Sequence, residues 1–191
     1  MGSIEAPELL RRHRLTVAQY HRMGETGVLP PDARVELIEG EVVDMAPIGT
    51  RHGGTVKWLN HTLNQAVGQR AIVAVQDPLR LGDRSEPQPD LMLLKPRADS
   101  YRTAHPTAAD VLLLIEVSDT TARYDCEIKL ALYARHGVAE VWIVDLDHGQ
   151  LSVHRHPADG GYGESSAAAQ PGVLTALALP GVAIDLTRLF G

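Results

Sequence analysis

The sequence predicts a mixed α/β domain in which helices flank a central β-sheet. The run "VLLLIEVS" at residues 111–118 is almost continuously apolar, as in a central strand covered on both faces. Residues 52–68 repeat apolar side chains at helical spacing, and short strand-like runs follow without regular strand–helix alternation. We therefore predict a mainly antiparallel or mixed sheet rather than a doubly wound one. No linker or repeat is visible, so we expect a single domain over residues 1–191, with 1–15 as an N-terminal extension.

The N-terminal third predicts a helix, a hairpin and a second helix. Thr16 and Gln19 have the spacing of a capping box, which predicts a helix over 16–24. Residues 33–47 alternate apolar and polar side chains on either side of Glu39-Gly40, as in a two-stranded hairpin. The amphipathic run 52–68 is expected to form a helix that ends at its final glycine.

The remaining elements are expected to supply most of the sheet. We predict a helix over 123–137, ended by Gly137, and a polar loop over 95–110. Residues 161–172 are rich in Gly, Ser and Ala and are expected to form a loop. Residues 174–190 predict a strand, a Pro-Gly turn and a short terminal helix. The expected strands cover 71–76, 78–81, 89–94, 111–118, 140–145 and 150–156.

Apolar runs, cysteine content and net charge argue against several classes of protein. No apolar run approaches the roughly 20 residues of a membrane helix, so no membrane association is expected. The single cysteine permits no internal disulfide, which favours a cytoplasmic protein. The formal net charge of -6 argues against coating nucleic acid through bulk charge. It leaves room for an enzyme that meets nucleic acid through a local basic patch and a metal.

Two acids are placed where a sheet would bury them. Glu116 continues the apolar strand 111–118, and Asp90 directly precedes the apolar run 91–94. A lone buried carboxylate is costly unless it is paired, protonated or bound to metal. Carboxylates at the ends of neighbouring strands can together bind Mg²⁺ with water and phosphate oxygens, an arrangement suited to phosphodiester hydrolysis. The alternatives are a structural ion pair for Glu116 and a turn-capping role for Asp90.

Lys129 and Glu36 are further candidates for the same site. Lys129 follows Glu116 on the next predicted helix and could orient an attacking water molecule. Its position four residues after Asp125 equally fits a surface ion pair. Glu36 lies in the predicted hairpin, on the strand face opposite Val35 and Leu37, and could complete a metal shell.

Other chemistries have weaker support. There is no HExxH pattern, and we expect His13, His21 and His148 to be solvated rather than zinc ligands. No G-x-S-x-G elbow supports a serine hydrolase. Basic residues near the Asp90 strand could contact phosphates or belong to a mixed-charge surface; they are Arg80, Arg84, Lys95, Arg97 and Arg102.

These stretches resemble a known nuclease family. "VELIEGEVVDMAP", "QPDLMLL", "LLLIEVSDTTARYDCEIKLALYARHGVAEVWIVDLD" and "LPGVAIDLTRLF" are similar to the Uma-two restriction endonucleases, a branch of the PD-(D/E)XK superfamily. The resemblance implies a restriction-endonuclease-like core with acids at one sheet edge. It matches Asp90 and Glu116 to the two metal-binding acids. The superfamily's lysine position is Ser118 here, and Lys129 matches the displaced lysine.

The same resemblance also implies accessory residues, a metal cofactor, a substrate and an oligomeric state. Glu36 matches an early glutamate of such sites, and His52 and Gln76 match accessory positions. It implies a Mg²⁺- or Mn²⁺-dependent endonuclease that acts on DNA as a homodimer. Two alternatives stay open: a binding or regulatory protein that has kept the fold without catalysis, and a hydrolase of RNA or another phosphoester.

Overall fold

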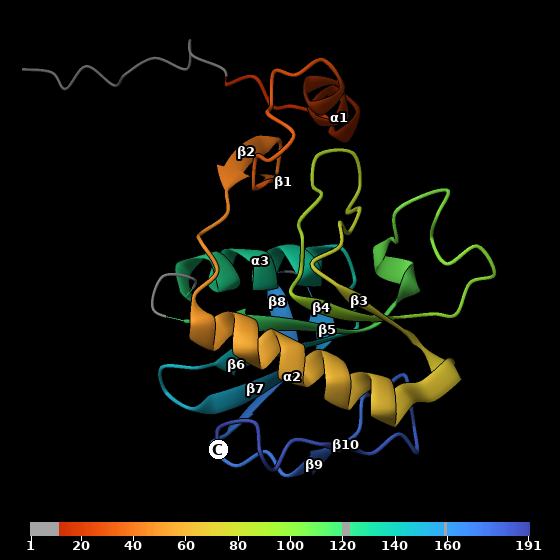
Figure 1. Cartoon of the computed structure of the whole chain (residues 1–191), viewed down its shortest axis with the longest axis vertical. Coiled ribbons are helices and arrows are strands. Elements are labelled where there is room, and N and C mark those ends of the chain that lie inside the picture. The colour runs from red at the N-terminus through yellow and green to blue at the C-terminus, as the bar shows by residue number, and fades with distance from the viewer. Residues whose placement is uncertain (1–11, 120–122, 159) are drawn as a thin grey trace, which may run out of the picture.

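The computed structural model describes residues 12–119, 123–158 and 160–191, without the side chains of 123–127. Within these residues a mixed α/β fold surrounds a six-stranded sheet with the order β3-β4-β5-β6-β7-β8 (Figure 1). The main elements are α1 (Val17–Glu25), β1 (Val35–Ile38), β2 (Glu41–Asp44), α2 (Thr50–Val67), β3 (Ile72–Val75), β4 (Leu91–Leu94), β5 (Val111–Ser118), α3 (Arg123–Arg135), β6 (Glu140–Asp145), β7 (Gln150–Ala158), β8 (Gly161–Ala168), β9 (Val173–Leu174) and β10 (Ile184–Asp185).

The sheet is mixed, as predicted. β5 and β6 are parallel and are connected through α3, whereas every other neighbouring pair is antiparallel. β5 lies between β4 and β6, and all but one of its residues are buried, as its apolar sequence predicts. The predicted strand 111–118 therefore has both its bounds and its central position right.

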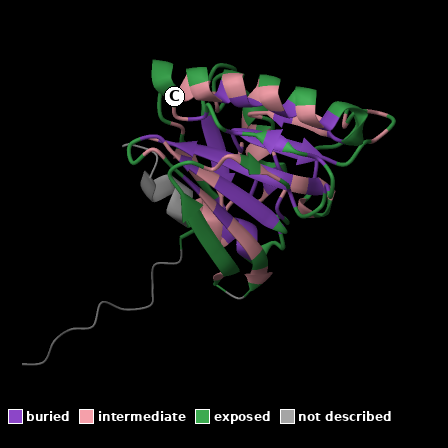
Figure 2. Ribbon diagram, turned by 90° about the horizontal axis from the view of Figure 1, so that it is seen from below, coloured by how far each residue is buried: buried purple, intermediate pink, exposed green. Residues whose placement is uncertain are grey.

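Helices cover the two faces of the sheet. α2 packs on one face with Leu113, Ile115 and Val117, and the short β9–β10 pair closes the same layer. α3 packs on the other face, where Leu114 and Tyr133 belong to a second apolar cluster. Figure 2 shows the buried strands between these layers. Side chains of β5 alternate between the two clusters, so Glu116 faces the α3 side.

The upper lobe of the molecule consists of α1 and the β1–β2 hairpin. Thr16 and Gln19 form the predicted capping box, since Thr16 Oγ1 accepts from the Gln19 amide at 3.2 Å and Gln19 Oε1 accepts from the Thr16 amide at 2.8 Å. Residues 1–11 of the predicted N-terminal extension (1–15) lie outside the described residues. At the end of the extension, the Leu15 amide donates to Gly40 O at 2.9 Å, and this hydrogen bond connects Leu15 to the hairpin.

Four predicted elements are wrong. Residues 161–168 are not a loop but strand β8, which pairs antiparallel with β7. β8 is an exposed edge strand, so its sequence does not have to alternate apolar and polar side chains. The backbone hydrogen bonds to β7 are what make this segment a strand. Residues 78–81 form isolated bridges rather than a strand, and residues 187–190 form a turn rather than a terminal helix. Residues 174–179 form no strand beyond Leu174, which ends β9.

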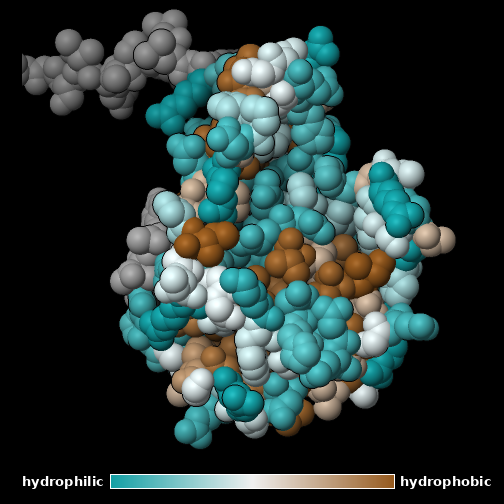
Figure 3. Space-filling view, in the orientation of Figure 1, coloured by the Kyte–Doolittle hydropathy of each residue, from teal (hydrophilic) through white to brown (hydrophobic). Residues whose placement is uncertain are grey.

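β8 forms one edge of the sheet. β6 lies between β5 and β7, and β7 lies between β6 and β8, so both are interior strands. The face shown in Figure 3 is mainly hydrophilic, with hydrophobic side chains gathered over β3, the opposite edge strand. Within the described residues, no helix is long and apolar enough to cross a membrane.

Candidate active site

The β4–β5 ladder brings Asp90 and Glu116 together at one edge of the sheet. Leu91 pairs with Ile115, so Asp90 and Glu116 lie one step further along the same antiparallel ladder. The Asp90 amide donates to Glu116 Oε2 at 3.2 Å. Only 8% of Asp90 and 4% of Glu116 are exposed. Both acids are therefore held next to each other and are largely buried.

α3 places Lys129 against two carboxylates rather than in solvent. Lys129 Nζ lies 3.0 Å from Glu36 Oε1 and 3.8 Å from Glu116 Oε1. One turn later, the Tyr133 hydroxyl donates to Glu116 Oε1 at 2.6 Å. The Asp125 side chain, the alternative partner of Lys129, lies outside the described residues.

β1 supplies Glu36 as the third acid. Val35 and Leu37 are buried beside it, and Glu36 itself is only 5% exposed. Its Oε2 accepts from the Gln88 amide at 3.0 Å, while its Oε1 faces Lys129. Glu36 and Glu116 therefore both contact the same Lys129 ammonium.

Two of the predicted accessory residues hold the Asp90 carboxylate. His52 Nε2 lies 3.0 Å from Asp90 Oδ2, and Gln76 Nε2 donates to Oδ1 at 3.2 Å. The Val117 amide also donates to Oδ2 at 2.9 Å. Gln76 has a φ of 53°, a strained conformation that often accompanies functional positions. Ser118, in contrast, donates to Asp119 O at 3.4 Å and does not line the pocket described next.

A solvent-open pocket with a cavity volume of about 80 Å³ lies over these residues. Glu36, Asp90, Glu116 and Lys129 form its polar floor, and residues 44–48 form part of its wall. Arg34 is an exposed cation in the lining. The buried acids can therefore be reached from outside the molecule.

Burial and neighbouring charges shift the pKa values of Glu116, Lys129 and His52. Burial raises the pKa of Glu116 from 4.5 to about 7, assisted by the neighbouring Asp90 and opposed by Lys129. Burial alone would lower the pKa of Lys129, but the Glu116 and Glu36 carboxylates outweigh it and raise that pKa. The hydrogen bond to Asp90 raises the pKa of His52. Lys129 is therefore held as a cation, and Glu116 changes charge near neutral pH.

The donor set fits a divalent cation. Three carboxyl groups, those of Glu36, Asp90 and Glu116, lie around a single ammonium group, so acidic oxygens outnumber the lysine as potential ligands. Among the described residues, no third acid, His or Cys joins Asp90 and Glu116 as a ligand within 4.8 Å. Mg²⁺ is commonly held by one or two carboxylates, with water and phosphate oxygens completing its shell. His52 Nδ1 is buried without a hydrogen-bond partner, so a polar group is also available beside the acids.

The basic residues expected near Asp90 are largely engaged elsewhere. Arg97 donates to both carboxylate oxygens of Asp99, at 2.5 and 2.9 Å, and Arg80 donates to Asp83 at 3.3 Å. Neither lines the pocket. Arg80 and Arg97 therefore belong to a mixed-charge surface, the alternative expectation for these basic residues.

Sequence reasoning missed several contributors to the site. Tyr133 was not among the candidates, although its spacing from Lys129 places both on one helix face. Gln88 acts through its backbone amide, which carries no sequence signal. Asp119 and Arg34 line the pocket but stand in segments without a distinctive pattern.

The chain has a nuclease-like α/β fold. A solved structure with this fold is described as "Crystal structure of a putative nuclease belonging to DUF820 from Anabaena variabilis ATCC 29413 at 1.96 A resolution". It has a TM-score of 0.66 and 18% sequence identity, and the match covers 82% of this chain and 89% of that one.

The chain belongs to the Uma2 family, described as "Putative restriction endonuclease", which matches residues 17–187. No curated protein matches the chain. The family resemblance and the fold class inferred from sequence are therefore confirmed.

Proposed function

We propose that the chain is a metal-dependent endonuclease that hydrolyses phosphodiester bonds in DNA. One observation carries the proposal. The Lys129 ammonium, on a side chain only 11% exposed, lies 3.0 and 3.8 Å from the Glu36 and Glu116 carboxylates, and Asp90 lines the same open pocket. Burying this many ionised groups is costly for stability alone, which favours a catalytic role. Membership of the Uma2 family supports the same reaction class.

Asp90 and Glu116 would bind Mg²⁺ or Mn²⁺ as adjacent carboxylates. The bound ion would supply an activated water molecule and offset charge on the scissile phosphate. Asp90 is oriented for this by His52, Gln76 and the Val117 amide. Such outer contacts fix the direction in which a ligand oxygen points.

Lys129 would act as a cation rather than as a base. Its raised pKa keeps Nζ protonated, so it can donate a hydrogen bond to water or to a phosphate oxygen that gains charge. Glu36 positions that ammonium through the 3.0 Å contact. Tyr133 fixes Glu116 by donating to Oε1, so the glutamate cannot rotate away from the pocket.

The substrate and assembly belong to the same proposal. Arg34 is exposed in the pocket lining, where it could contact a backbone phosphate. Cutting both strands of a duplex requires one hydrolytic event in each strand, which two copies of the pocket would supply. We therefore propose a homodimer, which light scattering on the eluted protein tests.

The function is tested by incubating purified wild type with supercoiled DNA, linear DNA and RNA in Mg²⁺, Mn²⁺ or EDTA. We expect cleavage of DNA that requires the metal. Asp90→Asn and Lys129→Met should each reduce the rate by about 100-fold or more, the usual cost of losing a metal ligand or a charge-stabilising donor. Lys57→Met, which removes an exposed lysine from α2, is the matched control and should cleave like wild type.

The outcomes separate the candidate functions. Equal cleavage by wild type, Asp90→Asn and Lys129→Met would mean that a contaminant is responsible and would contradict the proposal. DNA binding without cleavage under any metal would favour a non-catalytic binding protein. Preferential cleavage of RNA would keep the mechanism and change the substrate. Circular dichroism spectra verify that each variant is folded.

A further inference from the structure

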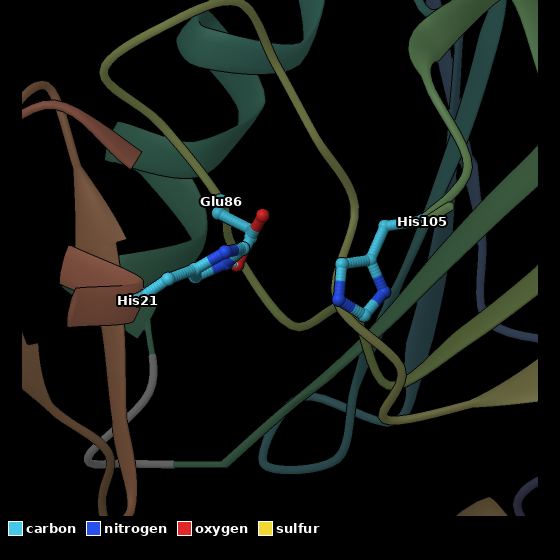
Figure 4. Close-up of side chains that lie close together, drawn as sticks. All are labelled: His21, Glu86 and His105. Carbon is cyan, nitrogen blue, oxygen red and sulfur yellow. Dashed lines mark hydrogen bonds and ion pairs between the residues drawn. The ribbon is translucent and has the colours of Figure 1, made fainter. Parts of the chain in front are cut away.

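A second cluster of polar side chains lies away from the candidate active site, where α1 meets two loops. His21 is on α1, Glu86 lies between β3 and β4, and His105 lies in the loop that follows β4 (Figure 4). One potential ligand atom of each residue lies within 4.8 Å of the other two. The rings of His21 and His105 approach edge to face, with centroids 6.1 Å apart. Three segments that are distant in sequence thus present metal-binding groups to one point.

Glu86 is buried with one oxygen unsatisfied. Only 3% of the residue is exposed, and its Oε1 lies 2.6 Å from His21 Nε2. Its Oε2 is buried and has no hydrogen-bond partner. Buried carboxylate oxygens are nearly always satisfied, so this oxygen requires a partner from outside the chain, such as water or a metal ion. A simple His21–Glu86 ion pair explains Oε1 but leaves Oε2 and the approach of His105 unexplained.

The donor types select a class of metal. Two imidazoles and one carboxylate form a typical three-ligand set for Zn²⁺ and related divalent transition metals, whereas Mg²⁺ and Ca²⁺ prefer oxygen ligands. Ligands at about 2.0–2.1 Å from a tetrahedral ion are about 3.3 Å apart. A modest closing movement is therefore required. His105 can make it, because it is exposed on a loop.

We propose that His21, Glu86 and His105 form a binding site for a Zn²⁺-like transition metal, which fastens α1 to the two loops. The site is separate from Asp90 and Glu116. Its Glu86 nevertheless adjoins the active-site hairpin, because the Glu86 amide donates to Leu37 O at 2.7 Å, next to Glu36. The metal would therefore fix the lobe that carries Glu36.

The proposal is tested by titrating tag-free protein with Zn²⁺ in a calorimeter and with Co²⁺ in a spectrophotometer. His105→Ala removes an exposed ligand and leaves the His21–Glu86 contact intact, and Glu86→Gln retains the side-chain shape. We expect each to weaken Zn²⁺ binding by about 100-fold or more, since losing even an outer-shell partner costs about 10- to 100-fold. Each should also remove the visible band of four-coordinate Co²⁺.

Two controls distinguish this site from others. His148→Ala removes another exposed histidine with a carboxylate partner, Asp145 at 2.8 Å, and should bind Zn²⁺ like wild type. Asp90→Ala disables the candidate active site and should retain the binding that His105→Ala loses. Unchanged Zn²⁺ affinity in His105→Ala would overturn the proposal. So would binding that disappears only in Asp90→Ala, which would place the ion in the acidic pocket.

Discussion

Glu116 is buried beside Asp90, Glu36 and Lys129, and this environment governs when it carries charge. The sequence marks Glu116 as unusual because a carboxylate interrupts an apolar strand. It cannot indicate how the charge is balanced, since Lys129 and Glu36 come from other elements. Nor can it indicate that Tyr133 donates to Glu116, because only the tertiary fold brings the helix face shared by Lys129 and Tyr133 to Glu116.

The charge of Glu116 predicts a pH-dependent stability. Its pKa is raised from 4.5 to about 7, so the folded protein holds this proton more tightly than the unfolded chain does. The stabilisation is fully present below pH 4.5 and is lost as the pH rises through about 7. The loss is about 3 kcal/mol in the free energy of unfolding. Glu116→Gln cannot ionise and should lack this loss, which urea denaturation between pH 4.5 and 8 measures.

The control for this prediction is Glu25→Gln, which changes an exposed glutamate on α1. Its curve of unfolding free energy against pH should run parallel to that of wild type. Added Mg²⁺ should reduce the wild-type loss above pH 7, because it favours the ionised carboxylate. If Glu116→Gln and wild type lose stability in parallel, Glu116 does not titrate in this range and the electrostatic account is wrong.

At the scale of elements, the hairpin is what brings Glu36 to the site. β1 pairs with β2 through a turn at Glu39-Gly40, as the sequence predicts. Gly40 has a φ of 81°, and a Cβ atom there would lie 2.8 Å from Arg14 Cβ and 2.9 Å from Leu15 O. The turn therefore requires glycine both for its conformation and for the close passage of the preceding segment.

Gly40→Ala is predicted to destabilise the hairpin more than a glycine change of similar geometry. Gly27 has a φ of 73°, and a Cβ atom added there would meet nothing within 4 Å, so Gly27→Ala isolates the conformational cost of about 1 kcal/mol. Gly40→Ala adds a steric clash and should cost about 1–3 kcal/mol more. Urea denaturation of both variants measures the difference. Equal losses would show that Arg14 and Leu15 do not press against the turn.

The errors in predicting elements have a common cause. The small polar residues of β8 carry no apolar alternation and so predict a loop, yet backbone pairing with β7 makes the segment a strand. The expected terminal helix is a turn, since Leu186 and Leu189 reach the core without a complete helical turn. Long apolar or strongly periodic segments such as 111–118 and 52–68 are predictable because burial alone determines them.

At the scale of the whole molecule, the candidate site is assembled from segments that are far apart in sequence. Glu36 comes from β1, Asp90 from the start of β4, Glu116 from β5 and Lys129 from α3. The sequence assigns each residue to an element, but the strand order that joins β4 to β5 is a tertiary property. The family resemblance supplied that arrangement, which periodicity alone could not provide. His21 was expected to be solvated, because no spacing pattern links it to Glu86 and His105, but its Nε2 lies 2.6 Å from the buried Glu86 carboxylate.

The most direct test of the central claim is anomalous diffraction from crystals soaked in Mn²⁺. We predict a peak at coordination distance, about 2.2 Å, from carboxylate oxygens of both Asp90 and Glu116, with Lys129 Nζ beside it and still paired with Glu36. Asp90→Asn crystals should lack this peak. A peak only at His21, Glu86 and His105, or no peak in the acidic pocket at saturating Mn²⁺, would contradict the assignment of Asp90 and Glu116 as metal ligands.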